Sequence, residues 1–391
     1  MNMSSSQRVP TEEHSRVQSY IDRINFVALK ERANQCYTER TGQAGVTCSI
    51  NPAKFASGRC NIVFEIVFPH GVTWIARVWT NHVGLFDADE ASSSLQCEVQ
   101  TMQYISDYSR IPVPKVFDYE LDPRNPVQYR FVIMEALLGS PLGMPYSAIP
   151  RPYLDKFLTQ LAEYLVELGT LSFPSIGCLQ YDTSTRVAEV VAPPGRHSAY
   201  TTSSQFVHDI RAEQNDLLLK NDVFSFPKED RELAACILLH AALGNLKREV
   251  QWGPFPLFHP DLHYNNILVD DQYNITGILD WSGVMTAPQE LFAAVPGFRC
   301  SPQSDERAAY ELCLELFIKA LRQREHKLLQ QGSWLVVSEM VGSDAAECIS
   351  KSLEKGMPWR GVPYAKHLLR FVFGGEATWD GVKKDLVREK L

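Results

Sequence analysis

The stretch Phe258-His-Pro-Asp-Leu-His-Tyr-Asn-Asn-Ile-Leu-Val-Asp270, followed shortly by Gly277-Ile-Leu-Asp-Trp281, is the most informative part of the sequence. Apolar, β-branched residues flank a polar turn at 270–274, and this pattern is typical of a short hairpin. Such a hairpin would bring Asn266 and Asp280 side by side although fourteen residues separate them. The stretch therefore predicts a cluster of acidic and amide side chains at the open end of a hairpin.

These side chains have the chemistry that phosphoryl transfer requires. In that reaction a polyanion is positioned and neutralised while a hydroxyl oxygen loses a proton. One carboxylate accepts the proton, and an amide oxygen with a second carboxylate can hold Mg²⁺, which prefers hard oxygen ligands. Asp261, Asn266 and Asp280 supply this set of groups.

The same residues resemble the aminoglycoside phosphotransferase family, whose loop has the form H-x-D-x-x-x-x-N followed by a D-W pair. His259, Asp261, Asn266, Asp280 and Trp281 stand at those positions, and the loop is especially similar to fungal members. The resemblance implies a bilobal, protein-kinase-like α+β fold with a small β-rich N-lobe and a larger, mainly helical C-lobe. It also implies ATP as phosphate donor, Mg²⁺ at Asn266 and Asp280, and Asp261 as the catalytic base.

The sequence before this loop agrees with a small β-rich lobe. Residues 61–68 and 73–79 have the pattern of paired strands, and a helical pattern follows at about 91–106. In the family, a basic residue on the third strand contacts the nucleotide phosphates and pairs with a glutamate on the next helix. Arg77 and Glu98 fall at those positions, and we expect Arg77 to serve the nucleotide with little effect on the stability of the unliganded protein.

Two further segments are candidates for nucleotide contacts. The small polar loop at 57–61 lies where the family places a phosphate-covering loop, although a plain hairpin turn explains it equally well. Residues 131–139 resemble the segment that links the lobes, where backbone groups would bind an adenine; a buried strand ending in a turn is the alternative. The candidate residues are Ser57, Gly58 and Asn61 in the loop and Met134, Glu135 and Ala136 in the linking segment.

We predict a helical extension at 1–45, a nucleotide-binding N-lobe at 46–136, and a C-lobe at 137–391 that holds the catalytic loop and the acceptor site. Within the C-lobe, residues 181–226 are rich in Ser, Thr, Pro and Gly and are expected to form a loop with one short helix. Periodic apolar residues predict helices at about 154–168, 229–250, 305–332 and 344–355.

The net charge of −8 and the absence of long Lys and Arg runs argue against a nucleic-acid partner. The polar first residues and the lack of a long apolar segment predict a cytoplasmic protein without a membrane partner. The nine cysteines occur singly, which favours reduced thiols over disulfides. The sequence does not choose between ATP and GTP, and it does not indicate the oligomeric state.

We expect the acceptor to be a hydroxyl group of a small soluble molecule. Asp280 is followed by Trp-Ser-Gly-Val-Met-Thr-Ala-Pro-Gln-Glu290, which lacks the peptide-supporting segment of protein kinases. Nearby acidic residues could attract a cationic amine, although such charges more often form a solvated helix face. These residues are Asp305, Glu306, Glu311 and Glu315.

Two other functions are compatible with parts of the sequence. His259, Asp261 and His263 form an H-x-D-x-H run that could ligate zinc or iron in a metal-dependent hydrolase. A catalytically impaired, kinase-like nucleotide-binding protein is the second alternative. It is favoured only by Arg77, where protein kinases have Lys, and by the single glycine of the 57–61 loop.

Overall fold

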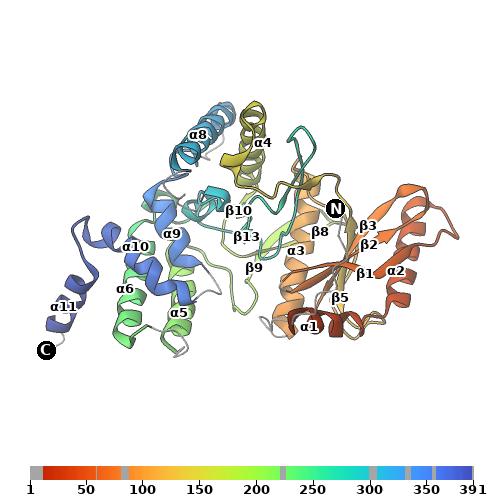
Figure 1. The fold of residues 1–391 in the computed structure, drawn as a ribbon, viewed down its shortest axis with the longest axis horizontal. Helices are drawn as coiled ribbons and strands as arrows, with labels where there is room; N and C mark the ends of the chain where they lie inside the picture. Colours follow the sequence, from red (N-terminus) through yellow and green to blue (C-terminus); the bar gives the residue numbers. More distant parts are fainter. Residues whose placement is uncertain are drawn as a thin grey trace. The chain divides into compact units, whose positions relative to one another are not determined.

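A computed structural model describes residues 12–58, 60–80, 88–220, 226–298, 306–330, 336–354 and 358–389. The chain forms two compact units, shown as a ribbon in Figure 1. Unit 1 contains the described residues up to Ser106 together with Val113–Leu137, and unit 2 contains Asp107–Pro112 and the described residues from Leu138 onward. The predicted α+β class is confirmed, because unit 1 holds a five-stranded sheet and unit 2 is mainly helical.

Unit 1 is built on an antiparallel sheet with the strand order β1-β2-β3-β5-β4. Side chains alternate between its two faces, as the period of a strand requires. The bounds are β1 Ser49–Ser57, β2 Asn61–Val67, β3 Thr73–Trp79, β4 Val116–Glu120 and β5 Arg130–Glu135.

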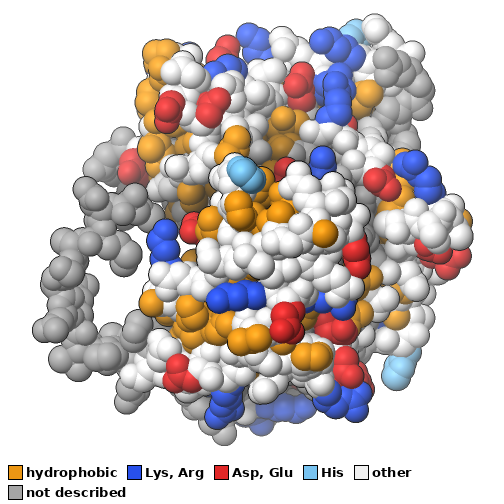
Figure 2. Space-filling model, turned by 90° about the vertical axis from the view of Figure 1, so that its right-hand side faces the viewer, with side chains coloured by type: hydrophobic (Ala, Val, Ile, Leu, Met, Phe, Trp, Pro, Cys, Tyr) orange, Lys and Arg blue, Asp and Glu red, His pale blue; other side chains and the backbone are white. Residues whose placement is uncertain are grey.

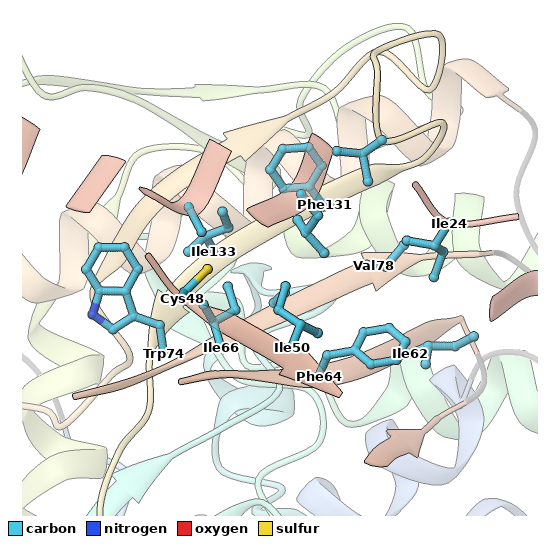
Figure 3. Close-up of a cluster of buried hydrophobic side chains, with 14 of the residues drawn as sticks. Ile24, Cys48, Ile50, Ile62, Phe64, Ile66, Trp74, Val78, Phe131 and Ile133 are labelled. Atoms are coloured by element: carbon cyan, nitrogen blue, oxygen red, sulfur yellow. The ribbon is translucent and has the colours of Figure 1, made fainter. Parts of the chain in front are cut away.

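One face of this sheet forms the hydrophobic core of unit 1 (Figure 3). Side chains such as Ile62, Phe64 and Ile66 point to this face and are fully buried. Helix α2 (Phe26–Thr41) covers the face, and α3 (Ala88–Tyr108) runs along the opposite one (Figure 1). The sheet therefore has an apolar side against α2 and a second side on which Arg77 lies.

The region of the predicted helical extension contains two helices. These are α1 (Glu12–Ile21) and α2, separated by a short break. Asn25 explains the break, because its side chain accepts a hydrogen bond from the Ala28 N–H at 3.2 Å and caps the start of α2.

Unit 2 contains two groups of helices. Helix α4 (Arg151–Thr170) buries its leucine face and lies beside α8 (Arg307–Leu329) (Figure 1). A second group shares another apolar core. Its members are α5 (Ser203–Lys220), α6 (Lys228–Gly244), α9 (Asp344–Leu353) and α10 (Gly361–Phe373), and α11 (Trp379–Glu389) is joined to α6 by an ion pair between Lys383 and Asp230.

The region 181–226 is more regular than predicted. It takes part in a hairpin of β8 (Cys178–Asp182) and β9 (Val187–Val191), and α5 is a full helix of 18 residues. The buried face of α5 includes Ser203, Arg211 and Gln214. Because polar residues interrupt the apolar period of this face, the sequence pattern did not indicate a long helix.

Short strands of unit 2 support the predicted catalytic loop. Strand β10 (Phe255–Phe258) is buried throughout and lies between β13 (Met285–Thr286) and β7 (Ser172–Phe173). The predicted hairpin is present as β11 (Ile267–Val269) and β12 (Ile275–Ile278), and β6 (Ser140–Pro141) pairs with β11. The remaining short helices are η1 (Pro69–Gly71), η2 (Tyr146–Ala148), η3 (Arg248–Val250), α7 (Gln289–Phe292), η4 (Pro296–Phe298) and η5 (Pro358–Arg360).

The surface carries mixed charges. Figure 2 shows one face on which basic and acidic side chains are interspersed, so that this face has no extended field of one sign. Across the part of the chain that the structure describes, no helix is both long enough and apolar enough to cross a membrane.

Helix α7 carries a buried carboxylate. The side chain of Glu290 is only 1% exposed, and its Oε1 accepts a hydrogen bond from the Lys247 N–H at 2.7 Å. Its Oε2 has no hydrogen-bond partner. Burial disfavours the charged form and raises the pKa of Glu290 above its ordinary value.

We predict that Glu290→Gln stabilises the protein at pH 8 by about 1 kcal/mol, since it removes an incompletely paired buried charge. Because the pKa of Glu290 is raised in the folded protein, its protonated form adds stability below pH 4.5, the ordinary pKa. This stability is lost as the pH rises through the pKa of the folded state. The gain should therefore shrink from pH 8 towards pH 4 in denaturant unfolding. The exposed Glu249→Gln is the control, and an equal, pH-independent effect of both variants would contradict the prediction.

Candidate active site

The loop between β10 and β11 is folded tightly around Asp261. The backbone carbonyl of Asp261 accepts hydrogen bonds from the His263 N–H at 2.8 Å and from Asn266 Nδ2 at 2.9 Å. The Asn266 N–H in turn donates to the His263 carbonyl at 2.9 Å. These bonds fix the backbone at Asp261 relative to the start of the hairpin.

His259 connects this loop to the far end of the hairpin. It is 2% exposed, and its Nδ1 accepts the Asp261 N–H at 3.2 Å. Its Nε2 must therefore carry the proton, which it donates to the Leu279 carbonyl at 3.0 Å. Burial lowers the pKa of His259, and the ring stays neutral at physiological pH.

Trp281 completes this buried support. Its ring lies edge-on to the imidazole of His259 with centroids 4.7 Å apart, and its Nε1–H donates to the Ile278 carbonyl at 2.9 Å. His259 and Trp281 thus position the residues around them through packing and hydrogen bonds. Both ring nitrogens of His259 are engaged, so it is not available as a metal ligand.

The hairpin places Asn266 and Asp280 next to each other along the ladder. Ile267 pairs with Ile278, and the Leu279 N–H donates to the Asn266 carbonyl at 2.8 Å. Asp280 follows directly, with an exposed side chain and a φ of 57°. This left-handed conformation is uncommon for residues other than glycine, although Asp and Asn adopt it more readily than most.

The side chain of Asp261 is 55% exposed and has two neighbours. Its Oδ2 lies 3.3 Å from Asn266 Nδ2 and 3.4 Å from His263 Nε2. In the sequence, His263 was a candidate only as a metal ligand, and its position beside the predicted base was missed. A histidine two residues after the base, in a loop short enough to turn back on itself, was the available signal.

The residues present fit a magnesium ion better than zinc or iron. The amide nitrogen of Asn266 is used by Asp261, so its Oδ1 is left as a hard oxygen ligand beside the carboxylate of Asp280. Mg²⁺ takes few protein ligands and completes its shell with phosphate and water oxygens. Among the described residues, no group of three or more His, Cys, Asp or Glu side chains could hold a metal, so the metal-dependent hydrolase is not supported.

In unit 1, Arg77 and Glu98 form a buried ion pair. Arg77 Nη1 lies 2.6 Å from Glu98 Oε1, and the two side chains are 10% and 1% exposed. Arg77 is in the middle of β3, between Val63 of β2 and Val132 of β5. Its neighbours along the strand, Ala76 and Val78, belong to the core on the other face.

This burial changes what is expected of Arg77. Removing one partner of a buried ion pair leaves the other charge uncompensated, which costs about 3–5 kcal/mol. The expectation that Arg77 has little effect on the unliganded protein is therefore revised. The pair joins β3 to α3, so breaking it would leave a charge buried at this junction.

The two other nucleotide candidates differ in how open they are. The Gly58 N–H donates to the Asn61 carbonyl at 2.9 Å, which continues the pairing of β1 with β2, and Ser57 and Gly58 are exposed while Asn61 is half-buried. In the linking segment, the Glu135 N–H donates to the Lys115 carbonyl at 2.9 Å and is not free for a base. Met134 is buried, and Ala136 is half-buried just after β5.

The predicted site residues thus form two groups, one within each unit. Unit 1 holds the Arg77–Glu98 pair, the hairpin turn and the linking segment. Unit 2 holds Asp261, Asn266 and Asp280 around one loop and one hairpin.

These features define a protein with the two-unit fold of the kinase-like phosphotransferases. The sequence model of the family described as "Phosphotransferase enzyme family" (APH) matches residues 53–289, which is more than half of the chain. The chain belongs to this family, and the family resemblance seen in the sequence is confirmed.

Two curated relatives are fungal proteins. The subtelomeric hrmA-associated cluster protein of Aspergillus fumigatus is 30% identical over 129 residues, covering 33% of this chain and 24% of the relative. The clavilactone A biosynthesis cluster protein Y of Ampulloclitocybe clavipes is 28% identical over 269 residues, covering 64% of this chain and 65% of the relative. The chain therefore spans less than two thirds of the length of either relative.

Solved structures share the fold at low identity. A thermostable mutant of aminoglycoside phosphotransferase APH(4)-Ia, in a ternary complex with ADP and hygromycin B, has a TM-score of 0.51 at 16% identity, over 88% of this chain and 99% of that one. A putative aminoglycoside phosphotransferase of Ralstonia eutropha has a TM-score of 0.50 at 14% identity, with the same coverage of 88% and 99%. This likeness confirms the predicted kinase-like fold.

We predict that Arg77→Ala lowers the free energy of unfolding by about 3 kcal/mol without any ligand, because the buried carboxylate of Glu98 loses the cation 2.6 Å from it. Arg77→Lys should lose less, since it keeps a cation near the carboxylate. Denaturant unfolding of the apoprotein measures both. Arg124→Ala, which breaks an exposed ion pair with Asp122, is the control and should cost less than about 1 kcal/mol. Equal losses for Arg77→Ala and Arg124→Ala would refute the structural role.

Proposed function

We propose that this protein is a small-molecule kinase that transfers the γ-phosphoryl group of ATP to a hydroxyl group. The observation that carries the proposal is the arrangement in unit 2, where the exposed carboxylate of Asp261 is held beside Asn266. The exposed carboxylate of Asp280 follows Asn266 at the end of the hairpin. A base and two hard oxygen ligands on one short loop and hairpin are what phosphoryl transfer needs from a protein.

In the proposed reaction, the acceptor oxygen forms a bond to the γ-phosphorus while the bond to the β,γ-bridging oxygen breaks and ADP leaves. The acceptor hydroxyl gives its proton to the carboxylate of Asp261. Asn266 Oδ1 and the Asp280 carboxylate would hold Mg²⁺, which would supply charge neutralisation for the phosphates. His259 keeps the loop and the hairpin end in register during this exchange.

The nucleotide site of the proposal uses residues of unit 1. Arg77, oriented by Glu98, is proposed to contact the phosphates, and the turn with Ser57, Gly58 and Asn61 is proposed to lie near them. The segment Met134, Glu135 and Ala136 would contact the base, with the Ala136 N–H as a donor because that of Glu135 is engaged. Two solved relatives of this fold contain ADP or AMP-PNP, which supports ATP over GTP as the first nucleotide to test.

We propose a cavity of about 200 Å³ in unit 2 as the acceptor pocket. Apolar groups of Val295, Phe298 and Leu314 form much of its wall. Val295 also lines a smaller cavity together with Phe258 and His259, which precede Asp261. One wall residue of the proposed pocket is therefore shared with a cavity at the end of β10, where the catalytic loop begins.

The charges around this cavity favour an uncharged acceptor. Its carboxylate, Glu347, is 2.7 Å from His367 Nε2 and 3.6 Å from Lys351 Nζ. The acidic residues at the start of α8 are exposed, as expected of a solvated helix face; they are Glu306, just before the helix, and Glu311 and Glu315 on it. Glu311 pairs with Arg307. Asp305 lies outside the described residues. A polycation such as an aminoglycoside would find no unpaired carboxylate among the described lining residues, so we propose a neutral hydroxylated compound.

We also propose that the protein works in the cytoplasm, without a nucleic-acid or membrane partner. The described cysteines are all free thiols, which fits a reducing compartment. The net charge of −8 gives no electrostatic basis for binding a polyanion.

We predict that a screen of neutral hydroxylated metabolites with MgATP will yield products heavier by one phosphate, and that Asp261→Asn will lower that turnover about 10²–10⁴-fold. Nucleotide binding should survive, because the substitution keeps the shape of the side chain. The exposed Asp271→Asn in the hairpin turn is the matched control and should be fully active. If wild type binds nucleotide and phosphorylates no compound, the catalytically impaired alternative is correct.

Asp280→Ala is predicted to abolish the magnesium dependence of nucleotide binding, because the carboxylate proposed to bind the metal together with Asn266 is then lost. Nucleotide affinity titrated against Mg²⁺ in wild type and variant measures this directly. Asp271→Ala, on the same hairpin, should behave as wild type. An unchanged magnesium dependence in Asp280→Ala would remove Asp280 from the metal site.

A further inference from the structure

We propose that His263 is a positioning residue for the base, holding Oδ2 of Asp261 so that Oδ1 is the oxygen that takes the acceptor's proton. The inference rests on the proposed function and assigns different roles to the two oxygens of one carboxylate. It concerns a residue that the proposed mechanism has so far not used.

The tautomer of His263 follows from its backbone contact. Its Nδ1 lies 3.1 Å from the backbone nitrogen of Asn265, whose N–H donates to it, so Nδ1 carries no proton. The proton of the neutral ring is therefore on Nε2. That nitrogen, with its proton, lies 3.4 Å from Oδ2 of Asp261, a close contact that is longer than a normal hydrogen bond.

A second donor approaches the same oxygen. Asn266 Nδ2 lies 3.3 Å from Oδ2 of Asp261 and also donates to the Asp261 carbonyl at 2.9 Å. Asn266 thus donates to Oδ2, and the N–H of His263 lies close to the same oxygen. No described residue donates to Oδ1 of Asp261, and the side chain is 55% exposed, so this oxygen can reach an acceptor.

This asymmetry has a chemical consequence. A carboxylate on a single-bonded side chain rotates, and a base is effective only when its oxygen is within hydrogen-bond reach of the proton that it abstracts. The Asn266 donor on Oδ2, with the His263 N–H close by, favours one plane of the carboxylate and leaves the lone pairs of Oδ1 unused. The contacts at 3.3–3.4 Å are somewhat longer than the usual range of about 2.7–3.2 Å, as catalytic hydrogen bonds often are before substrates bind.

Of the two donors, His263 is the one that can be changed alone. Asn266 also closes the loop and is proposed to bind the metal, so its substitution would alter several functions together. The ring of His263 is half-buried and lies edge-on to Tyr264, with centroids 5.6 Å apart. Leucine can replace the ring without a donor, and glutamine can place an N–H close to the position of Nε2.

The test uses MgATP with water as the acceptor, so it needs no identified metabolite. Release of ADP is measured for wild type, His263→Leu, His263→Gln and Asp261→Asn. We expect His263→Leu to lower kcat about 10–100-fold, the scale of a misplaced catalytic group, with the KM for ATP unchanged. His263→Gln should recover most of the loss, and His240→Leu, on the exposed side of α6, is the control.

A double variant separates positioning from a general structural effect. Once Asp261 is Asn, its orientation no longer matters, so Asp261→Asn with His263→Leu should be no slower than Asp261→Asn alone. Wild-type kcat in His263→Leu, no recovery in His263→Gln, or a further loss in the double variant would each overturn the inference. Loss of ADP release in Asp261→Asn would still support the proposed function, whereas no ADP release by wild type would overturn both.

Discussion

The hydrogen bonds of the buried His259 ring are the constraint on which the rest of the candidate site depends. One nitrogen holds the backbone of Asp261, and the other holds the Leu279 carbonyl, directly before Asp280. A neutral imidazole satisfies both only in one tautomer, and burial against Trp281 keeps it neutral. The hydrogen bonds of His259 therefore set the spacing between Asp261 and Asp280. Its ring forms no hydrogen bond to either carboxylate.

The charged side chains of the two units differ in their exposure to solvent. In unit 1 the charged pair of Arg77 and Glu98 is buried, so its geometry is built into the fold and tied to the stability of the sheet and α3. In unit 2 the carboxylates of Asp261 and Asp280 are exposed, and hydrogen bonds hold the backbone next to each of them. The proposed function would thus use a buried cation in unit 1 and two accessible anions in unit 2.

The catalytic loop, the hairpin and the strand pair of unit 1 could be predicted because local residue patterns specify them. The length of α5 could not, since its buried face contains Arg211 and Gln214, and a polar residue looks the same in a sequence whether it is buried or solvated. The loss of stability expected on substituting Arg77 could not be predicted either, because it depends on the burial of the Arg77–Glu98 pair. The contact between His263 and Asp261 depends on how a tight loop turns, which spacing alone does not determine.

The left-handed backbone at Asp280 limits how this position can vary. A glutamate offers the same carboxylate to a cation, but its longer side chain gives the backbone less local support in this conformation. Glycine and asparagine adopt the conformation easily, yet glycine has no ligand and asparagine has no charge. Under the proposed function, the residue at this position would have to satisfy both the backbone and a cation, and aspartate does both.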